Sequence, residues 1–336
     1  CMADESSPHI VTEIAETFSS LREQTPWHLH MIAESNVYDA RMLQPLDGGG
    51  HGYDAQWCDD FLHSVFAVLR PGEQMSQRVY HGEDLQSVLH RGYIYAGSLS
   101  MPRQRISLEE DPHRADLTSL VFSIQNHDFI GNHPLGQRLH NLTSHDAHRA
   151  AATLLLLYPA IPMLFMGEEF ASPHPFYFFV DYSDPHMREA VERGRRAEYP
   201  QHDWSGGASP LSPTAFHASR IGPAAEGNAQ TLAWYQRLVA LRKEWRELGL
   251  VTGDTLHSHW LIDQQTAVLH YRLGDAVRFV VARLSSEVMQ HAPLTMRLDG
   301  EVELNQNCDV DSAKGEMTVL VNGIAIGRGT VGSIGG

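Results

Sequence analysis

LVFSIQNHD, residues 120–128, carries the clearest indication of how this chain folds. It begins with apolar and β-branched residues, which are typical of a buried strand, and it ends abruptly on amide, imidazole and carboxylate side chains. A buried strand with polar groups at its carboxyl end is typical of an α/β barrel, in which those ends carry the catalytic residues. The alternative is a buried strand followed by an ordinary polar turn, because three-residue matches such as Asn-His-Asp arise easily by chance.

The composition is that of a folded, acidic protein. The chain has 336 residues, of which 42% are hydrophobic, enough for one large domain and a small second one. Its 25 Lys and Arg residues stand against 41 Asp and Glu residues, so the formal net charge is −16. That charge argues against nucleic acid or an anionic membrane as a partner and suits a neutral substrate. The 21 His residues are scattered without an HExxH or Cys/His array, so we expect neither a metal nor another cofactor.

The cysteines and the apolar runs bear on the cellular compartment. Cys1, Cys58 and Cys308 are few and lack paired spacing, which argues against a disulfide framework and predicts a reducing, cytoplasmic compartment. The most apolar run, residues 154–166, contains two prolines and is shorter than the roughly 20 residues that a membrane span needs. No signal peptide is visible, but the sequence begins with Cys rather than Met, so we expect further residues upstream.

Strand and helix patterns alternate through the first 250 residues. Residues 4–21 are expected to form a helix whose apolar residues Ile10, Ile14, Phe18 and Leu21 face the core. Further helices are expected at 64–70, 84–91, 145–157, 184–195 and 230–248, and strands at 29–33, 120–125 and 161–166. Residues 93–114 lack periodicity and are expected to form a long binding loop or lid.

The pattern changes after Gly249. Short alternating segments at 261–262, 267–273, 277–284, 294–298 and 317–321 predict an antiparallel β module, and the glycine-rich tail 322–336 is expected to fray. We therefore expect an α/β domain over residues 1–249 and a small antiparallel β domain over residues 250–336. Only about four strand and helix units are visible where a complete barrel has eight, so the first domain is expected to be half of a barrel.

Two carboxylates at strand ends suggest glycoside chemistry. Glu34 and Asp128 follow different strands, and glycoside hydrolysis uses a pair of carboxyl groups flanking the bond that breaks. Alternatively, Glu34 is a solvated residue at a strand end. Asp59, Asp60 and His63 can grip sugar hydroxyls, or they can simply cap a helix and form its first turn. The aromatic residues Trp57, Phe61, Tyr93 and Tyr95 can stack on sugar rings, or each can belong to the core.

Five segments together resemble the alpha-amylase superfamily of glycoside hydrolases, and more narrowly its maltooligosyltrehalose trehalohydrolase family. They are IAES (32–35), GYDAQWCDDFLH (52–63), QNHDFIGNHPLGQRL (125–139), PMLFMGEEFASPHPFYFFVDYSDP (162–185) and REAVERGRRAEY (188–199). The resemblance extends from about residue 2 to residue 247. It implies the C-terminal portion of a (β/α)8 TIM barrel, followed by a small antiparallel β-sandwich domain.

The resemblance also implies roles for individual residues. Glu34 matches the general acid and base, and Asp128 matches the carboxylate that stabilises the transition state by binding sugar hydroxyls. The positions that match substrate-binding residues are Asp59, Asp60, Phe61, His63, His127, Phe129, Ile130, Gly131 and Asn132. The family's nucleophilic aspartate aligns upstream of Cys1, and Asp4 is expected to line the substrate site without replacing it. Leu62, Phe129 and His133 depart from the family's usual residues, which puts details of the substrate subsites in question.

The expected function is that of a retaining hydrolase in trehalose biosynthesis. It would release trehalose from maltooligosyl trehalose by cleaving the α-1,4 bond next to the trehalose end, and the chain by itself is expected to be inactive without the nucleophile. One alternative is another superfamily enzyme, such as a glucan branching enzyme or an amylase. The other is a non-catalytic glucan-binding protein. The sequence leaves the chain-length preference, the pH optimum and the oligomeric state open.

Overall fold

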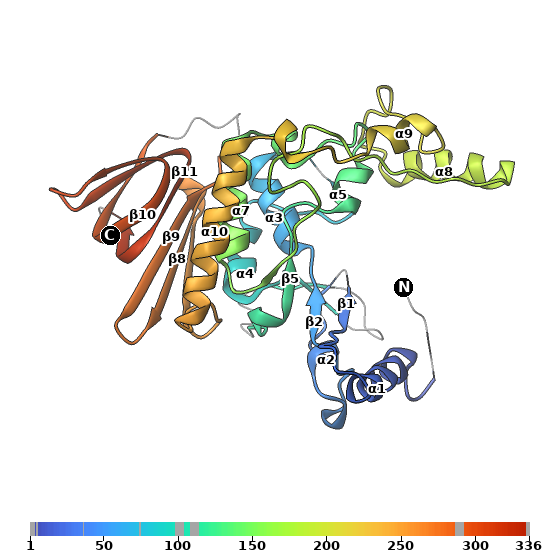
Figure 1. Ribbon diagram of the computed structural model, residues 1–336, viewed down its shortest axis with the longest axis horizontal. Helices are drawn as coiled ribbons and strands as arrows, with labels where there is room; N and C mark the ends of the chain where they lie inside the picture. Colours follow the sequence, from blue (N-terminus) through green and yellow to red (C-terminus); the bar gives the residue numbers. More distant parts are fainter. Residues whose placement is uncertain are drawn as a thin grey trace.

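A computed structural model describes residues 4, 6–35, 37–73, 75–97, 104–107, 114–285 and 292–333. An α/β body lies at the centre, the antiparallel sheet lies on one side of it, and a lobe and an arm project from the other side (Figure 1). Cys1 and parts of the expected 93–114 loop lie outside the described residues. No helix in the described part of the chain is long and apolar enough to cross a membrane.

The body is built on a four-stranded parallel sheet with the order β1-β2-β5-β6. Its strands are β1 (Ile32–Glu34), β2 (Ala55–Trp57), β5 (Leu120–Phe122) and β6 (Ile161–Pro162). Every neighbouring pair is parallel, and β1 and β6 form its two edges. The predicted part of a barrel is thus confirmed. β5 and β6 are shorter than predicted, and β6 ends at Pro162, which has no N–H to donate to the ladder.

Helices, 3-10 turns and a short strand pair make up the other elements that connect the strands. The helices are α1 (Ile10–Glu23), α2 (Ala40–Leu43), α3 (Asp60–Leu69), α4 (Asp84–Arg91), α5 (His127–Asn132), α6 (Leu139–Leu142), α7 (His145–Leu157), α8 (Pro185–Glu198), α9 (Pro213–Ala218) and α10 (Ala229–Glu247). Four 3-10 turns, Leu46–Gly48, Leu117–Ser119, Ala224–Glu226 and Ile262–Gln264, and the strand pair β3 (Tyr95–Ala96) and β4 (Gln104–Arg105) complete the connections. The projecting lobe contains α1 and α2, and the arm contains α8 and α9 (Figure 1).

Helix α1 differs from its prediction in position and in the face that it buries. It begins at Ile10 rather than residue 4, because His9 caps it and the Asp4 carboxylate accepts the Ile10 N–H at 2.6 Å. Ile10, Ile14 and Leu21 are 37%, 40% and 51% exposed, so the prediction that they face the core is wrong. Helical spacing identifies an apolar face, but it does not say what covers that face.

The C-terminal part forms a five-stranded antiparallel sheet with the order β10-β11-β9-β8-β7. Its strands are β7 (Leu256–Leu261), β8 (Thr266–Leu273), β9 (Ala276–Arg283), β10 (Leu294–Asp311) and β11 (Glu316–Ser333). The first residues of β10 pair with both ends of β11, so the sheet folds over a second core. That core contains Val268, Phe279, Val281, Met296, Leu298, Met317, Val319, Ala325 and Val331. The predicted small antiparallel β domain is confirmed.

The glycine-rich tail does not fray where it is described. Residues 322–333 belong to β11, in which Ile324 pairs with Ala282 of β9 and is fully buried. Gly327 lies so close to β10 that a Cβ atom there would be 1.9 Å from the Glu301 carbonyl oxygen. These glycines therefore allow a close approach of backbones rather than flexibility, which is why the prediction of a frayed tail is wrong here.

Helices α7 and α10 join the two parts through the larger hydrophobic core. Tyr235, Leu238 and Trp245 of α10 are buried in a cluster that also contains strand residues from both sheets. The Arg242 guanidinium donates hydrogen bonds to the carbonyl oxygens of Leu156 and Tyr158 at 2.8 and 2.7 Å. The domain boundary near Gly249, between the end of α10 and the start of β7, remains our proposal.

Candidate active site

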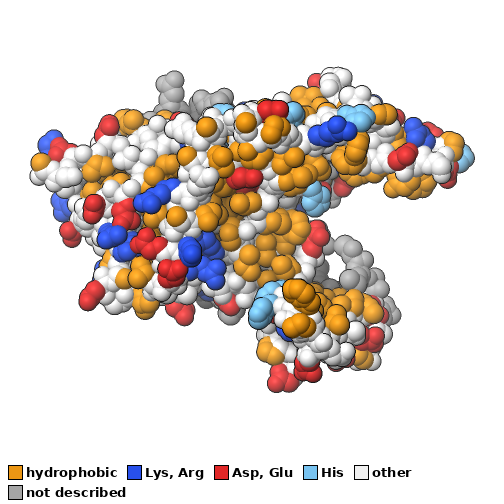
Figure 2. Space-filling model, in the orientation of Figure 1, with side chains coloured by type: hydrophobic (Ala, Val, Ile, Leu, Met, Phe, Trp, Pro, Cys, Tyr) orange, Lys and Arg blue, Asp and Glu red, His pale blue; other side chains and the backbone are white. Residues whose placement is uncertain are grey.

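The parallel register brings the predicted site residues to one edge of the sheet. Glu34 at the end of β1 is paired with Trp57 at the end of β2, and Trp57 is paired with Val121 of β5. Because the strands are parallel, their carboxyl ends and the residues that follow them lie on the same side. Glu34, Asp59 and Asp128 therefore gather at one rim, as the sequence predicts. The rim opens into a hollow between the lobe and the arm (Figure 2).

Asp59 lies near the other carboxylates and is held by two side chains. Its Oδ1 accepts hydrogen bonds from Trp57 Nε1 at 2.8 Å and from Asn126 Nδ2 at 3.2 Å. Burial raises the pKa of Asp59 to about 6, and the nearby charges of Asp128, Asp60 and Glu34 add to this rise. Glu34 and Asp128 are thus both near enough to Asp59 for their charges to act on it.

Asp128 is exposed at the first turn of α5 and is fixed by a chain of polar groups. Asn126 caps this helix by accepting the Phe129 N–H at 2.7 Å. Asn132, one turn later, donates to Asp128 Oδ1 and to the Tyr199 hydroxyl, both at 2.7 Å. Arg195 of α8 completes the chain by donating to Asn132 Oδ1 at 2.5 Å. Asn132 is buried, and its hydrogen bond holds the Asp128 carboxylate in place.

Several other predicted binding residues lie beneath the rim. Asp60 is buried, and its carboxylate accepts the Ile94 N–H at 2.7 Å and the Tyr80 hydroxyl at 2.8 Å. Phe61 is fully buried with its ring stacked at 4.9 Å on Phe122, and Phe129 and Ile130 are also buried. The His63 ring stacks on Tyr80, and burial lowers the pKa of His63 to about 3, so it is neutral at physiological pH. These residues support the surface that a substrate can reach.

Of the remaining predicted residues, His127 and Gly131 lie in α5 with Asp128, whereas Asp4 precedes helix α1. His127 is exposed beside Asp128, with its ring 6.3 Å from that of Trp57 in an edge-on arrangement. Gly131 follows in α5, where its backbone carbonyl accepts Arg195 Nη2 at 2.6 Å. Asp4 accepts the N–H of Ser6 and of Ile10, and these hydrogen bonds lower its pKa. No three His, Cys, Asp or Glu side chains among the described residues are grouped to hold a metal ion.

Sequence comparison finds relatives that share one description. A malto-oligosyltrehalose trehalohydrolase of Saccharolobus solfataricus is 34% identical over 265 residues, covering 77% of this chain and 44% of that protein. One of Deinococcus radiodurans is 36% identical over 300 residues, covering 83% and 48%. Over about three quarters of its length or more, this chain is therefore similar to malto-oligosyltrehalose trehalohydrolases. It spans about half the length of these relatives, and no family model matches it.

Solved structures share the fold of this chain. A putative alpha amylase from Salmonella typhimurium has a TM-score of 0.71 and 22% identity, covering 97% of this chain and 55% of its own. A trehalose-6-phosphate hydrolase from Bacillus licheniformis has a TM-score of 0.55 and 13% identity, covering 96% and 59%. Because both identities are low, this likeness shows only the fold, which is a partial barrel followed by a β domain.

Sequence reasoning missed the residues that hold the carboxylates in place. Tyr199 and Arg195 contact Asn132 from positions more than 60 residues further along the chain. Both lie in the REAVERGRRAEY segment that supports the family resemblance, and that segment is the only signal that singles them out. Trp57 was considered as a sugar-stacking residue, whereas its indole N–H also fixes Asp59.

Replacing Asp59 by Asn is expected to stabilise the protein at neutral pH. The pKa of Asp59 is raised from 3.8 to about 6 in the folded protein. The contribution of this carboxyl group to the stability of the fold is therefore complete below about pH 4 and is lost as the pH rises through 6. Asn still accepts the Trp57 N–H but carries no charge. We expect a gain of about 1–3 kcal/mol in the free energy of unfolding at pH 7 and a much smaller gain near pH 4. Urea unfolding at both pH values measures this, and an equal gain at both would contradict it. Asp263→Asn, at an exposed position, is the control.

Proposed function

We propose that the full-length protein hydrolyses the α-1,4-glucosidic bond next to the terminal trehalose unit of maltooligosyl trehalose. The observation that carries the proposal is the meeting of Glu34, Asp59 and Asp128 at one strand rim, in a chain whose relatives are named trehalohydrolases. Glycosidases need one carboxyl group to protonate the leaving oxygen and others to stabilise or attack the sugar. The substrate is neutral, which suits a chain with a net charge of −16.

The proposed mechanism gives each rim residue one task. Glu34 protonates the glycosidic oxygen as the bond breaks, and it later takes a proton from the attacking water. Asp128, held by Asn132, accepts hydrogen bonds from sugar hydroxyls and stabilises the positive charge that develops on the ring. In a retaining mechanism a further carboxylate attacks the anomeric carbon, and we propose that it lies outside this chain.

Two further proposals accompany this function. We propose that the protein acts in the cytoplasm, in trehalose biosynthesis, since Cys58 and Cys308 are both free. We also propose that residues 1–336 expressed alone show no turnover, because we place the nucleophile outside them. An α-1,4-glucan other than maltooligosyl trehalose is the alternative substrate.

Product analysis tests the proposal directly. Full-length protein incubated with maltotriosyl trehalose is expected to release trehalose and maltotriose in equal amounts, as measured by chromatography. New α-1,6 branches would identify a branching enzyme, and cleavage at internal bonds without trehalose release would identify an amylase. Binding of the oligosaccharide without any product would identify a non-catalytic glucan-binding protein. Each of these three outcomes would overturn the proposed reaction.

A further inference from the structure

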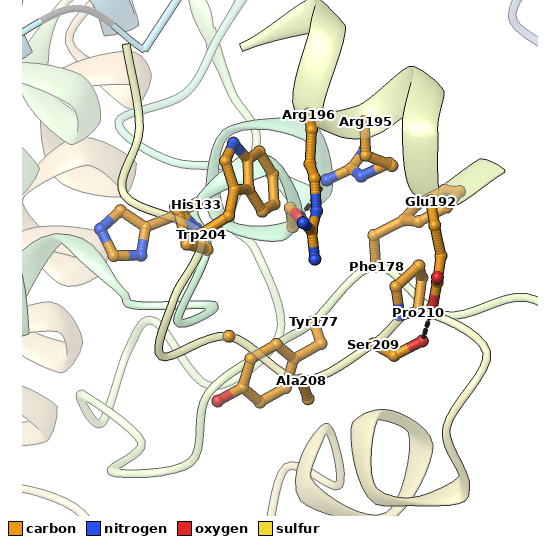
Figure 3. Close-up of a pocket in the computed structure, with 13 residues that line it drawn as sticks. His133, Tyr177, Phe178, Glu192, Arg195, Arg196, Trp204, Ala208, Ser209 and Pro210 are labelled. Carbon is orange, nitrogen blue, oxygen red and sulfur yellow. Dashed lines mark hydrogen bonds between the residues drawn. The ribbon is translucent and has the colours of Figure 1, made fainter. Parts of the chain in front are cut away.

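A pocket of about 140 Å³ lies beside α5, under the arm (Figure 3). Its walls come from residues 177–178, from one face of α8 and from the loop 204–210, and its floor comes from residues 131–134. Ligand pockets usually measure roughly 300–1,000 Å³, so this one has room for a single ring rather than for a longer oligomer. None of its wall residues on α8 or in the loop is among the predicted site residues.

Aromatic rings form much of the wall. Tyr177, Phe178 and Trp204 surround the open space, and Phe178 is 38% exposed (Figure 3). Trp204 Nε1 donates to the Tyr199 carbonyl oxygen at 3.1 Å, so its only polar atom is already satisfied. The Arg195 guanidinium lies 4.2 Å from the centre of the Phe178 ring and 5.9 Å from that of Trp204. The rings are therefore held in place and offer apolar surface to a ligand.

The polar groups of the pocket carry both signs of charge. Arg196 extends into the open space (Figure 3), and no hydrogen bond or ion pair is recorded for it within the described parts of the chain. Glu192, one turn earlier on the same helix, accepts a hydrogen bond from the Ser209 hydroxyl. A carboxylate beside the arginine disfavours an anionic ligand, and donors and acceptors around aromatic rings suit a neutral polyhydroxylated one.

The pocket is connected to the catalytic rim by direct contacts. Arg195, in its wall, donates to Asn132 Oδ1 at 2.5 Å, and Asn132 holds Asp128. Gly131 in its floor follows Asp128 by about one turn of α5, and a Cβ atom built at Gly131 would be 3.5 Å from the Phe178 backbone nitrogen, an ordinary contact distance. The wall at Phe178 therefore lies directly against α5. A ring bound in this pocket would lie next to the helix that carries Asp128.

We propose that this pocket binds one glucosyl ring of an α-1,4-glucan, with the sugar's C–H face on the aromatic wall and its hydroxyls on Arg196 and Glu192. The inference rests on the proposed function for its choice of sugar. It extends that function by assigning a substrate subsite to residues of α8 and the loop 204–210.

Equilibrium binding of maltohexaose to the full-length protein tests the subsite. Isothermal titration is carried out with Trp204→Ala and Arg196→Gln, each compared with a matched control. Phe216→Ala removes an aromatic ring that is 49% exposed outside the pocket, and Arg193→Gln changes an exposed arginine of the same helix that pairs with Glu189. We expect both pocket variants to bind about 3- to 10-fold more weakly and both controls to bind like the parent.

Unchanged binding in the pocket variants, or an equal loss in the controls, would overturn the subsite. Absence of maltohexaose binding by the parent would overturn it as well. If Trp204→Ala lowers the midpoint temperature of unfolding, the binding result of Arg196→Gln alone is used to judge the subsite. Arg196 is exposed, and an exposed side chain can be changed without disturbing the fold. The proposed reaction is judged separately by trehalose release. If trehalose is released but the pocket variants bind maltohexaose like the parent, only the subsite is wrong. If the pocket variants bind more weakly but no trehalose is released, only the proposed reaction is wrong.

Discussion

Glu34→Gln in the full-length protein is expected to lower the rate of trehalose release by on the order of 10²- to 10⁴-fold, the usual contribution of a general acid. Glu34 ends β1, is exposed at the rim, and lies beside Trp57 of the neighbouring strand. Glutamine has nearly the same shape but cannot transfer a proton to the glycosidic oxygen. Because the position is exposed, we expect the free energy of unfolding to change little.

The measurement is the steady-state rate on maltooligosyl trehalose, and it includes a second substrate that isolates the acid's role. A maltooligosaccharide with a nitrophenolate leaving group needs little protonation, so the variant should be much less impaired on it. Glu16→Gln, at an exposed carboxylate on α1, serves as the control and should be fully active. Near-normal trehalose release by Glu34→Gln would remove Glu34 from the role of acid. Equal impairment on both substrates would argue for a structural defect instead.

Glu168→Gln is expected to remove a pH dependence of stability that spans several kcal/mol. Glu168 follows β6 and is fully buried, with Oε1 accepting the Tyr235 hydroxyl at 2.9 Å, and that hydroxyl also contacts His148 Nε2 at 2.9 Å. Burial raises the pKa of Glu168 from 4.5 to about 8. Its folded-state pKa is above the unfolded value, so its stabilising effect is complete below about pH 4.5 and is lost as the pH rises through 8.

Relative to the parent, Glu168→Gln should therefore gain stability steadily between about pH 5 and pH 8 and then stay level. The full difference across this window is on the order of 2–5 kcal/mol. Urea unfolding of the full-length protein at several pH values measures it. A poorly paired amide would add a constant offset, so the slope with pH carries the test. Glu247→Gln, at an exposed position of α10, is the control. A difference between Glu168→Gln and the parent that is the same at pH 5 and pH 8 would contradict the prediction.

Strand ends and their polar residues were predictable from the sequence because these signals are local. The run from Leu120 to Asp128 shows a buried strand followed by polar groups, and the structure has β5 and the start of α5 there. The same local rule places Glu34 at the end of β1. Parallel pairing then requires the strand ends to share one edge, so the meeting of Glu34 and Asp128 follows from fold class alone.

Burial and pairing at a distance were not predictable in the same way. The apolar stripe of α1 and the tail of β11 each have a clear composition, yet the first is exposed and the second is packed into a sheet. A pattern along the chain states what a segment can bury, whereas the neighbours that cover it come from other segments. For α1 and β11 the covering contacts, or their absence among the described residues, reversed the prediction.

The sequence by itself determined the fold class, the strand ends that carry Glu34 and Asp128, and the kind of chemistry that two such carboxylates can perform. Only the tertiary structure decided that Asp59 lies near both of them with a pKa raised by desolvation, and that Asn132, itself bonded to Tyr199 and Arg195, holds Asp128 in place. The physical reason is that hydrophobic periodicity and strand termination act between near neighbours in the chain. Desolvation, hydrogen bonding and the walls of a pocket depend instead on residues that come together only when the chain is folded.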